Sequence, residues 1–144
     1  MAAIVRSACI LLCVAASCLL ADTHADVVDV FASMAAALTD ANASGFMKPM
    51  DKDAQDYDTL RKNVAALITS TEISSSVEVV KDDGDDAKRT VDLDWYLQIR
   101  SLLQDGPVTN RRQIIRCELQ REGKRWKVVS LKPIDFFAPA KLDK

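Results

Sequence analysis

Two carboxylates, Asp92 and Asp94, form the residue pair whose types and spacing come closest to catalytic chemistry. They lie two positions apart in a segment of strand character, so both side chains fall on one face with Cα atoms about 6.5 to 7 Å apart. That separation suits a general acid paired with a general base. The alternative is a solvated polar face, shared with Tyr96 and Arg100, with cross-strand ion pairs to residues such as Arg116. A catalytic carboxylate needs burial to raise its pKa, and the alternation indicates none, so we predict no catalytic residue.

Tyr57 and the acidic run Asp82–Asp86 are the next groups with potential chemistry. Tyr57 falls on the apolar face of a predicted helix, where a tyrosine usually packs in the core, and it is a weak third catalytic candidate. The acidic run could bind calcium, but it lacks the glutamate that closes an EF-hand loop, so a solvated turn is favoured. The sequence contains neither a glycine-rich phosphate loop nor a nucleophile elbow. We therefore predict no metal and no cofactor.

The first 25 residues hold the only histidine and three of the four cysteines. An apolar run over residues 8–21 is followed by Thr23 and Ala25, two small residues at the spacing that a signal peptidase accepts. We expect residues 1–25 to be a signal peptide and the working chain to begin directly after it. Loss of His24 with the leader would leave no imidazole for base catalysis or metal binding.

The same segment sets the expectations for membranes and disulfides. Its apolar run is 14 residues long, whereas a membrane-spanning helix needs about 20, so we predict no transmembrane segment. Lipidation is the alternative processing route, because Ala15-Ala16-Ser17-Cys18 loosely resembles a bacterial lipobox and Cys18 would then carry a lipid anchor. Either route predicts an exported protein, periplasmic or secreted. Cys117 has no disulfide partner within the folded domain and is expected to be a buried, apolar residue.

Charge is divided unevenly along the chain. Residues 26–110 carry 16 acidic and 8 basic side chains, whereas residues 111–132 carry 8 basic and 2 acidic ones. This division could steer an anionic partner or favour self-association, and the plainer interpretation is that both sets lie on solvated faces. The basic segment lacks interleaved exposed aromatic residues and the whole chain is acidic, so we predict no nucleic-acid partner.

Helical spacing comes first in the sequence. One apolar stripe predicts a helix capped by Asp26 and ending near residues 42–45. A second stripe predicts a helix from Tyr57 to Thr69 with Asp56 as its cap. The first stripe consists of Val27, Phe31, Met34 and Leu38, and the second of Tyr57, Leu60, Val64, Leu67 and Ile68.

Strand spacing follows from Ile73 onward. A first strand leads to the acidic run, where Asp83-Gly84 marks the centre of a predicted hairpin turn. The return strand has a buried face, and two more strands are predicted near residues 110–121 and from Arg125 to about Phe137. The buried face of the return strand consists of Val91, Leu93, Trp95, Leu97 and Ile99.

Several of these core and turn patterns occur together in one known family. They are the Phe31 helix, Phe46-Met47, the helix Tyr57–Thr69, the Asp94-Trp95 strand, the turn Arg121–Val128, Pro133 and Phe136-Phe137. This combination resembles the nuclear transport factor 2-like superfamily. The resemblance implies an α+β, cone-shaped, cystatin-like roll, in which amphipathic helices pack against a curved antiparallel four-strand meander. It covers one domain at residues 26–139, followed by a flexible tail at 140–144, and leaves only residues 45–56 for a hairpin common among members.

Members of that family include isomerases, dehydratases and epoxide hydrolases, as well as binding domains without activity, so the fold alone does not choose a function. We expect a non-catalytic domain that binds a small apolar or amphipathic ligand, or a protein partner, between helices and sheet. The alternatives are a pocket enzyme that uses a carboxylate and a tyrosine, and a structural module that forms a homodimer through its sheet. The expected ligand-binding residues are Phe31, Met34, Phe46, Met50, Tyr57, Trp95, Leu97 and Trp126.

Overall fold

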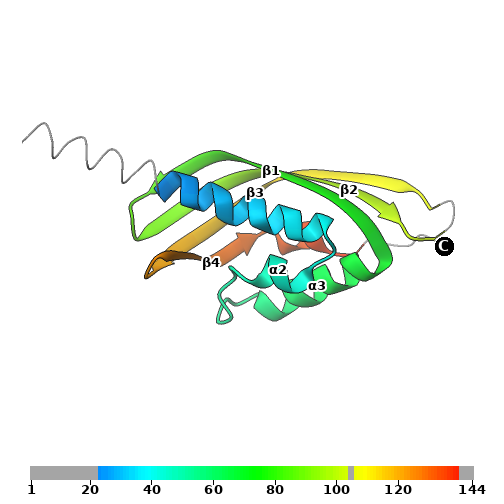
Figure 1. Cartoon of the computed structure of the whole chain (residues 1–144), viewed down its shortest axis with the longest axis horizontal. Helices are drawn as coiled ribbons and strands as arrows, with labels where there is room; N and C mark the ends of the chain where they lie inside the picture. The colour runs from blue at the N-terminus through cyan, green and yellow to red at the C-terminus, as the bar shows by residue number, and fades with distance from the viewer. Residues whose placement is uncertain (1–22, 104–105, 140–144) are drawn as a thin grey trace, which may run out of the picture.

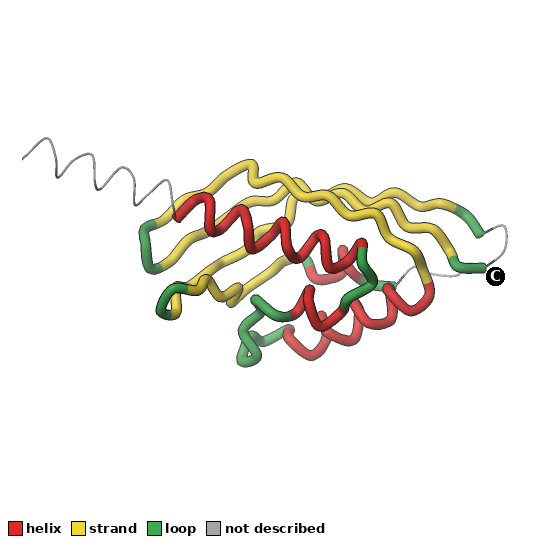
Figure 2. Tube along the Cα trace, in the orientation of Figure 1, coloured by secondary structure: helices red, strands yellow, loops and turns green. Residues whose placement is uncertain are grey.

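The computed structural model describes residues 23–103 and 106–139. The first 22 residues of the expected signal peptide, with the lipidation site Cys18, lie outside the described part, as does the predicted tail at 140–144. Helices come first and a four-stranded antiparallel sheet follows, which is the predicted α+β order (Figure 1). Figure 2 shows the long strands curving over the helices.

The N-terminal helix is described over residues 23–39. Its predicted stripe is confirmed, since all four residues are at most 1 % exposed. The helix already includes residues before Asp26, so the prediction that Asp26 caps it is wrong. At the other end, Ala41 adopts a left-handed conformation (φ 55°), and the amide of Asn42 donates to the carbonyl of Ala37 at 2.8 Å. These features form a Schellman-type end that reverses the chain.

The segment between the two long helices is short. Helix α2 (Ala43–Met47) is capped by Asn42, whose side chain accepts a hydrogen bond from the amide of Gly45. Residues 48–56 then form turns and one parallel bridge, from Met50 to Val128, within the stretch that the sequence resemblance leaves for a hairpin. This bridge attaches the segment to the edge of the sheet.

Helix α3 (Tyr57–Ser70) follows the predicted bounds closely. Leu60, Val64 and Leu67 are fully buried, and Tyr57 is partly buried against the same core. Asp56 stands at the N-cap position, but its side chain makes no capping hydrogen bond. The prediction that its carboxylate caps the helix is therefore wrong.

The sheet is a meander of four strands in the order β1-β2-β3-β4, each antiparallel to the next. Strand β4 ends at Lys132, whereas the sequence predicted a strand to about Phe137. Pro133 has no N–H to continue a ladder, and a 3-10 turn, η1 (Ile134–Phe137), follows it. The strands are β1 (Thr71–Gly84), β2 (Lys88–Ser101), β3 (Val108–Glu122) and β4 (Arg125–Lys132).

The first hairpin reverses slightly later than predicted. Gly84 has the expected positive φ (138°), but it still pairs with Arg89. The reversal lies at Asp85–Lys88, where the Asp85 carboxylate accepts hydrogen bonds from the amides of Ala87 and Lys88, both at 2.8 Å. These two bonds, first the one from Lys88, lower the pKa of Asp85. An Asx-type turn has displaced the predicted Asp-Gly turn by three residues.

Candidate functional site

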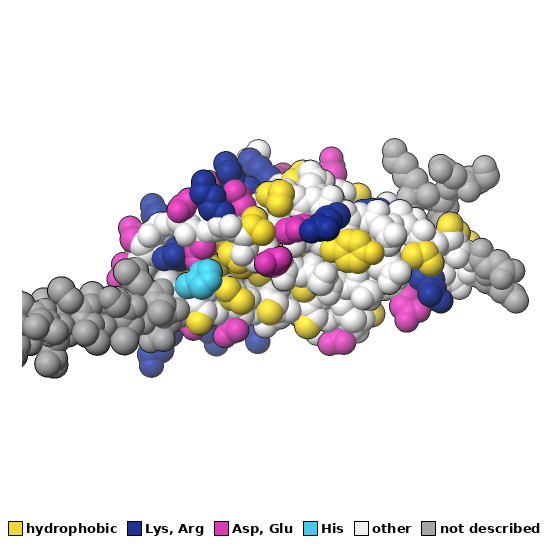
Figure 3. Space-filling view, turned by 90° about the horizontal axis from the view of Figure 1, so that it is seen from above, with side chains coloured by type: hydrophobic (Ala, Val, Ile, Leu, Met, Phe, Trp, Pro, Cys, Tyr) yellow, Lys and Arg dark blue, Asp and Glu magenta, His cyan; other side chains and the backbone are white. Residues whose placement is uncertain are grey.

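The carboxylates of Asp92 and Asp94 lie on the outer face of the sheet, because they alternate with the fully buried side chains of strand β2. Asp92 accepts two hydrogen bonds from Arg116, at 2.9 and 3.3 Å, and Asp94 accepts two from Arg112, at 3.0 and 2.6 Å. Figure 3 shows side chains of both charges gathered over the strands. The hydrogen bonds from the arginines lower the pKa of both carboxyls. Each carboxylate is therefore held in its ionised form, which is a weak base at neutral pH.

The interior of the cone is filled by aromatic rings. The ring of Phe137 lies 5.0 Å from Trp95, 5.2 Å from Phe46 and 5.1 Å from Phe136, measured between centroids. The Trp95 indole donates to the hydroxyl of Ser75 at 2.9 Å. Five of the eight expected ligand-binding residues are fully buried in this core. They are Phe31, Met34, Phe46, Trp95 and Leu97.

The segment that carries Phe137 is held by a half-buried cation. The guanidinium of Arg111 donates to the carbonyl oxygens of Phe136, at 2.9 Å, and Ala138, at 2.6 Å. Burial lowers the pKa of Arg111. No sequence pattern indicates this role for Arg111, because the spacing predicts a strand through the terminal segment.

Two expected ligand-binding residues, Met50 and Trp126, line an open hollow of about 760 Å³ at one end of the molecule. Three segments form its walls: the start of the N-terminal helix, the chain after α2, and the β3–β4 hairpin. Its apolar surface includes Val30, Pro49, Met50 and Trp126, and its charged residues are Asp26, Asp29, Lys48, Glu122, Lys124, Arg125 and Lys127.

Trp126 is the most unusual group in that wall. Its side chain is almost fully buried, and its Nε1 has no hydrogen-bond partner among the described residues. The guanidinium of Arg121 lies 5.8 Å from the ring centroid, within cation–π range. A buried donor that lacks a partner costs free energy, and an absent ligand or water is one common explanation.

Within the part of the chain that the structure describes, the unpaired positive and negative side chains lie on different walls of the hollow. Lys127 is engaged by Asp51 at 3.2 Å and by Glu122 at 3.3 Å, and these contacts raise its pKa. The other five charged residues of the hollow form no ion pair with any described residue. They are Asp26, Asp29, Lys48, Lys124 and Arg125. The hairpin and the chain after α2 contribute the cations Lys48, Lys124 and Arg125, and the helix contributes Asp26 and Asp29.

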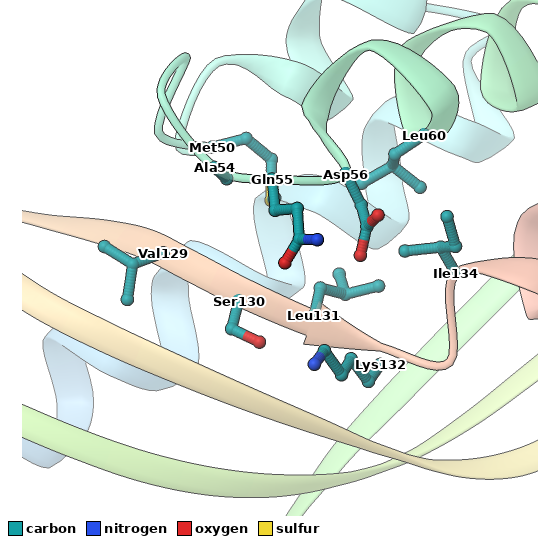
Figure 4. A pocket seen from close by; sticks show the side chains of 10 residues that line it. All are labelled: Met50, Ala54, Gln55, Asp56, Leu60, Val129, Ser130, Leu131, Lys132 and Ile134. Atoms are coloured by element: carbon teal, nitrogen blue, oxygen red, sulfur yellow. The ribbon is translucent and has the colours of Figure 1, made fainter.

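A smaller pocket of about 160 Å³ lies between the chain before α3 and strand β4. Figure 4 shows Gln55 and Asp56 pointing from the loop toward the strand, where Ser130 and Lys132 lie. Leu60 and Ile134 contribute apolar walls. Its volume has room for a few water molecules and is below the range of about 300 to 1,000 Å³ that is typical of ligand sites.

The acidic run and Cys117, which the sequence also singled out, pair or pack with other residues of the fold. In the acidic run, the side chain of Asp82 is only 5 % exposed and pairs with Arg89 at 2.6 Å. The described residues contain no cluster of three or more metal-ligating side chains and no helix long and apolar enough to cross a membrane. Cys117 is fully buried, and burial raises the pKa of its thiol.

The sequence has no match among protein-family models or curated proteins, but the structure is similar to several solved ones. A proposed scytalone dehydratase from Novosphingobium aromaticivorans is 10 % identical over 80 % of this chain and 85 % of its own, with a TM-score of 0.70. A hexachlorocyclohexane dehydrochlorinase (LinA Type2) is 12 % identical over 80 % and 86 %, with a TM-score of 0.66. A nuclear transport factor 2-like superfamily protein from Salmonella enterica is 8 % identical over 86 % and 96 %, with a TM-score of 0.61.

These similarities show the fold of the chain, which is the nuclear transport factor 2-like fold, as predicted. A cystatin-like structure from Nostoc punctiforme is also similar, with a TM-score of 0.58 at 11 % identity over 75 % of this chain and 86 % of its own. Enzymes and proteins of unknown function both appear among the similar structures.

Proposed function

We propose that this protein binds a small amphipathic molecule with one negative charge, in the hollow between the N-terminal helix, the chain after α2 and the β3–β4 hairpin. The observation that carries the proposal is Trp126, a buried side chain whose N–H has no partner among the described residues and which lines this hollow. The Nε1 atom is itself covered, so a small shift of the Trp126 ring toward the hollow would let a ligand oxygen supply the missing acceptor. The hollow, at about 760 Å³, is within the usual size range for small-molecule sites.

The charges of the walls support a monoanion. Lys48, Lys124 and Arg125 provide three cations without ion pairs among the described residues. On the facing helix, Asp26 and Asp29 would repel a second anionic group. The apolar part of the ligand would pack on Val30, Pro49 and Met50, as the tail of a medium-chain carboxylate does on an apolar wall.

The ion pairs that hold the two candidate carboxylates favour a binding role for this protein over a catalytic one. Asp92 and Asp94, the candidates for acid and base, are on the outer face and neutralised by arginines. Tyr57 packs against the core and does not line this hollow. The proposed site therefore contains none of the three catalytic candidates.

Tryptophan fluorescence titration with decanoate tests the proposal, with decanol and decyltrimethylammonium as neutral and cationic comparisons. Decanoate should bind most tightly, because it alone satisfies the cations and supplies a charged acceptor. Lys124→Glu should weaken decanoate binding by about tenfold or more, a loss of roughly 1.4 kcal/mol. Lys62→Glu makes the same charge change on an exposed part of α3 and should leave affinity unchanged. Equal affinity for the three probes, or equal weakening by both variants, would reject the site.

A further inference from the structure

A buried ion pair lies where the β1–β2 hairpin meets the start of the N-terminal helix. Asp82 and Arg89 have side chains only 5 % and 8 % exposed, and the Nε of Arg89 donates to one oxygen of the Asp82 carboxylate at 2.6 Å. Arg89 also donates to the carbonyl of Asp85 at 2.9 Å. A buried carboxylate of this kind is stable only when both of its oxygens have partners.

His24 provides the second partner. Its Nδ1 lies 2.6 Å from the other carboxylate oxygen of Asp82, and its side chain is 52 % exposed. The residue beside it, Thr23, is only 4 % exposed, and Val27, one turn further on, is fully buried. The turn that contains Thr23 and His24 is thus a packed part of the domain.

We propose that any leader is removed upstream of Thr23, so that the mature N-terminus lies between Cys18 and Thr23. A cut after Ala25, as the sequence pattern suggested, would delete buried Thr23 and leave one oxygen of a buried carboxylate without its partner. It would also remove the first described turn of the helix. The loss of a partner to a buried charge is among the more destabilising changes a fold can undergo.

The sequence contains a cut site that lies upstream of Thr23. Ala15 and Ser17 have the same small-x-small spacing as Thr23 and Ala25. A cut after Ser17 would make Cys18 the first residue, as lipidation also requires. His24 then remains in the working protein. The mature chain thus keeps one imidazole, whereas cleavage after Ala25 would remove it.

Expression of the full chain in a Gram-negative host, followed by intact mass measurement and N-terminal sequencing of the exported form, tests the proposal. The expected first residue lies between Cys18 and Thr23, with or without the added mass of lipid on Cys18. A first residue at His24 or later would overturn it, and so would an unprocessed chain.

A stability comparison tests the physical reason separately. A chain beginning at Thr23 should unfold at a temperature about 5 °C or more above that of a chain beginning at Asp26. His24→Ala in the longer chain should reproduce most of this loss. Val28→Ala, at a partly exposed position on the same helix, should reproduce little of it. Equal stability of the two chains would contradict the proposal, whereas failure of the shorter chain to fold would support it.

Discussion

The indole Nε1 of Trp95 donates a 2.9 Å hydrogen bond to the hydroxyl of Ser75, joining strands β2 and β1 inside the core. Trp126 is almost as deeply buried, yet its Nε1 has no partner among the described residues. The two tryptophans therefore have the same chemistry and opposite hydrogen-bond states. This difference separates a structural residue from a candidate binding residue.

Trp95→Phe should be markedly more destabilising than Trp126→Phe. The first substitution removes a hydrogen bond, leaves the Ser75 hydroxyl without it and opens space in the aromatic core, for a loss of about 2 to 3 kcal/mol. The second removes a donor that was already unsatisfied, so it should cost less than about 1 kcal/mol. Urea unfolding of both variants measures the difference. Similar losses would mean that the Trp126 donor is satisfied in solution.

A double-mutant cycle isolates the Trp95 hydrogen bond itself. Ser75→Ala should be destabilising in the natural chain and nearly neutral once Trp95 is phenylalanine, because the hydroxyl then has no indole donor. Additive effects of the two substitutions would show that the bond contributes nothing beyond packing.

The outer-face ion pairs should contribute stability that disappears in acid. The pKa of Asp94 is lowered by hydrogen bonds from Arg112, so its folded value lies below the unfolded value of about 3.9. The stabilising contribution is thus complete above the unfolded pKa and is lost as pH falls through the folded pKa. Asp94→Asn should be less stable than the natural chain at pH 7, by a small amount because the pair is exposed to solvent.

Thermal unfolding from pH 7 to pH 2 checks this sign. The difference between Asp94→Asn and the natural chain should stay constant down to about pH 4.5 and then shrink. Asp58→Asn is a suitable control, because Asp58 is fully on the surface of α3 and its contact to Arg61 is long, at 3.6 Å. A difference for Asp94 that grows in acid would contradict the assignment.

Cys117 should be unreactive in the folded protein. It is fully buried on β3, and desolvation raises the pKa of its thiol, so little thiolate forms at pH 8. In a chain beginning at Thr23, Cys117 is the only cysteine. Ellman's reagent should modify it at the rate of unfolding and rapidly in denaturant. Stoichiometric modification within minutes under native conditions would show an opening of the sheet that this structure does not contain.

Much of the fold could be predicted because its patterns are local. The apolar stripe around Phe31 and the alternation from Val91 to Ile99 each reflect one periodicity, and both are confirmed. The errors occurred where one side chain overrides the periodicity, as Asp85 does in the first hairpin, or where a distant residue holds the chain. Strand β4 stops at Pro133, and the following turn is held by Arg111 from another strand.

The candidate site was harder to predict for the same reason. Apolar type identified Phe46, Trp95 and Leu97 as interior residues, but it could not distinguish a filled core from an open cavity. That distinction depends on Phe137, whose ring reaches the core only because the chain turns after β4. The hollow instead uses charged residues from three separate segments, and no single window of sequence contains them.

The two glycines of the hairpins should respond differently to alanine. Gly84 has a φ of 138°, and a Cβ atom there would lie 2.2 Å from the carbonyl oxygen of Lys88, so Gly84→Ala must disturb the β1–β2 hairpin backbone. Gly123 has a φ of 63°, and a Cβ atom there would meet nothing within 4 Å. Gly123→Ala should therefore cost only the left-handed backbone conformation, about 1 to 2 kcal/mol.

Urea unfolding of the two alanine variants should give the larger loss for Gly84→Ala. That hairpin also positions Asp82 and Arg89 under the N-terminal helix, so its distortion should weaken the contact with His24 as well. Chemical-shift changes at His24 should accompany Gly84→Ala and be absent in Gly123→Ala. A loss for Gly84→Ala no larger than that for Gly123→Ala would mean that the first hairpin relaxes freely, and that the ion pair beneath the helix does not depend on its geometry.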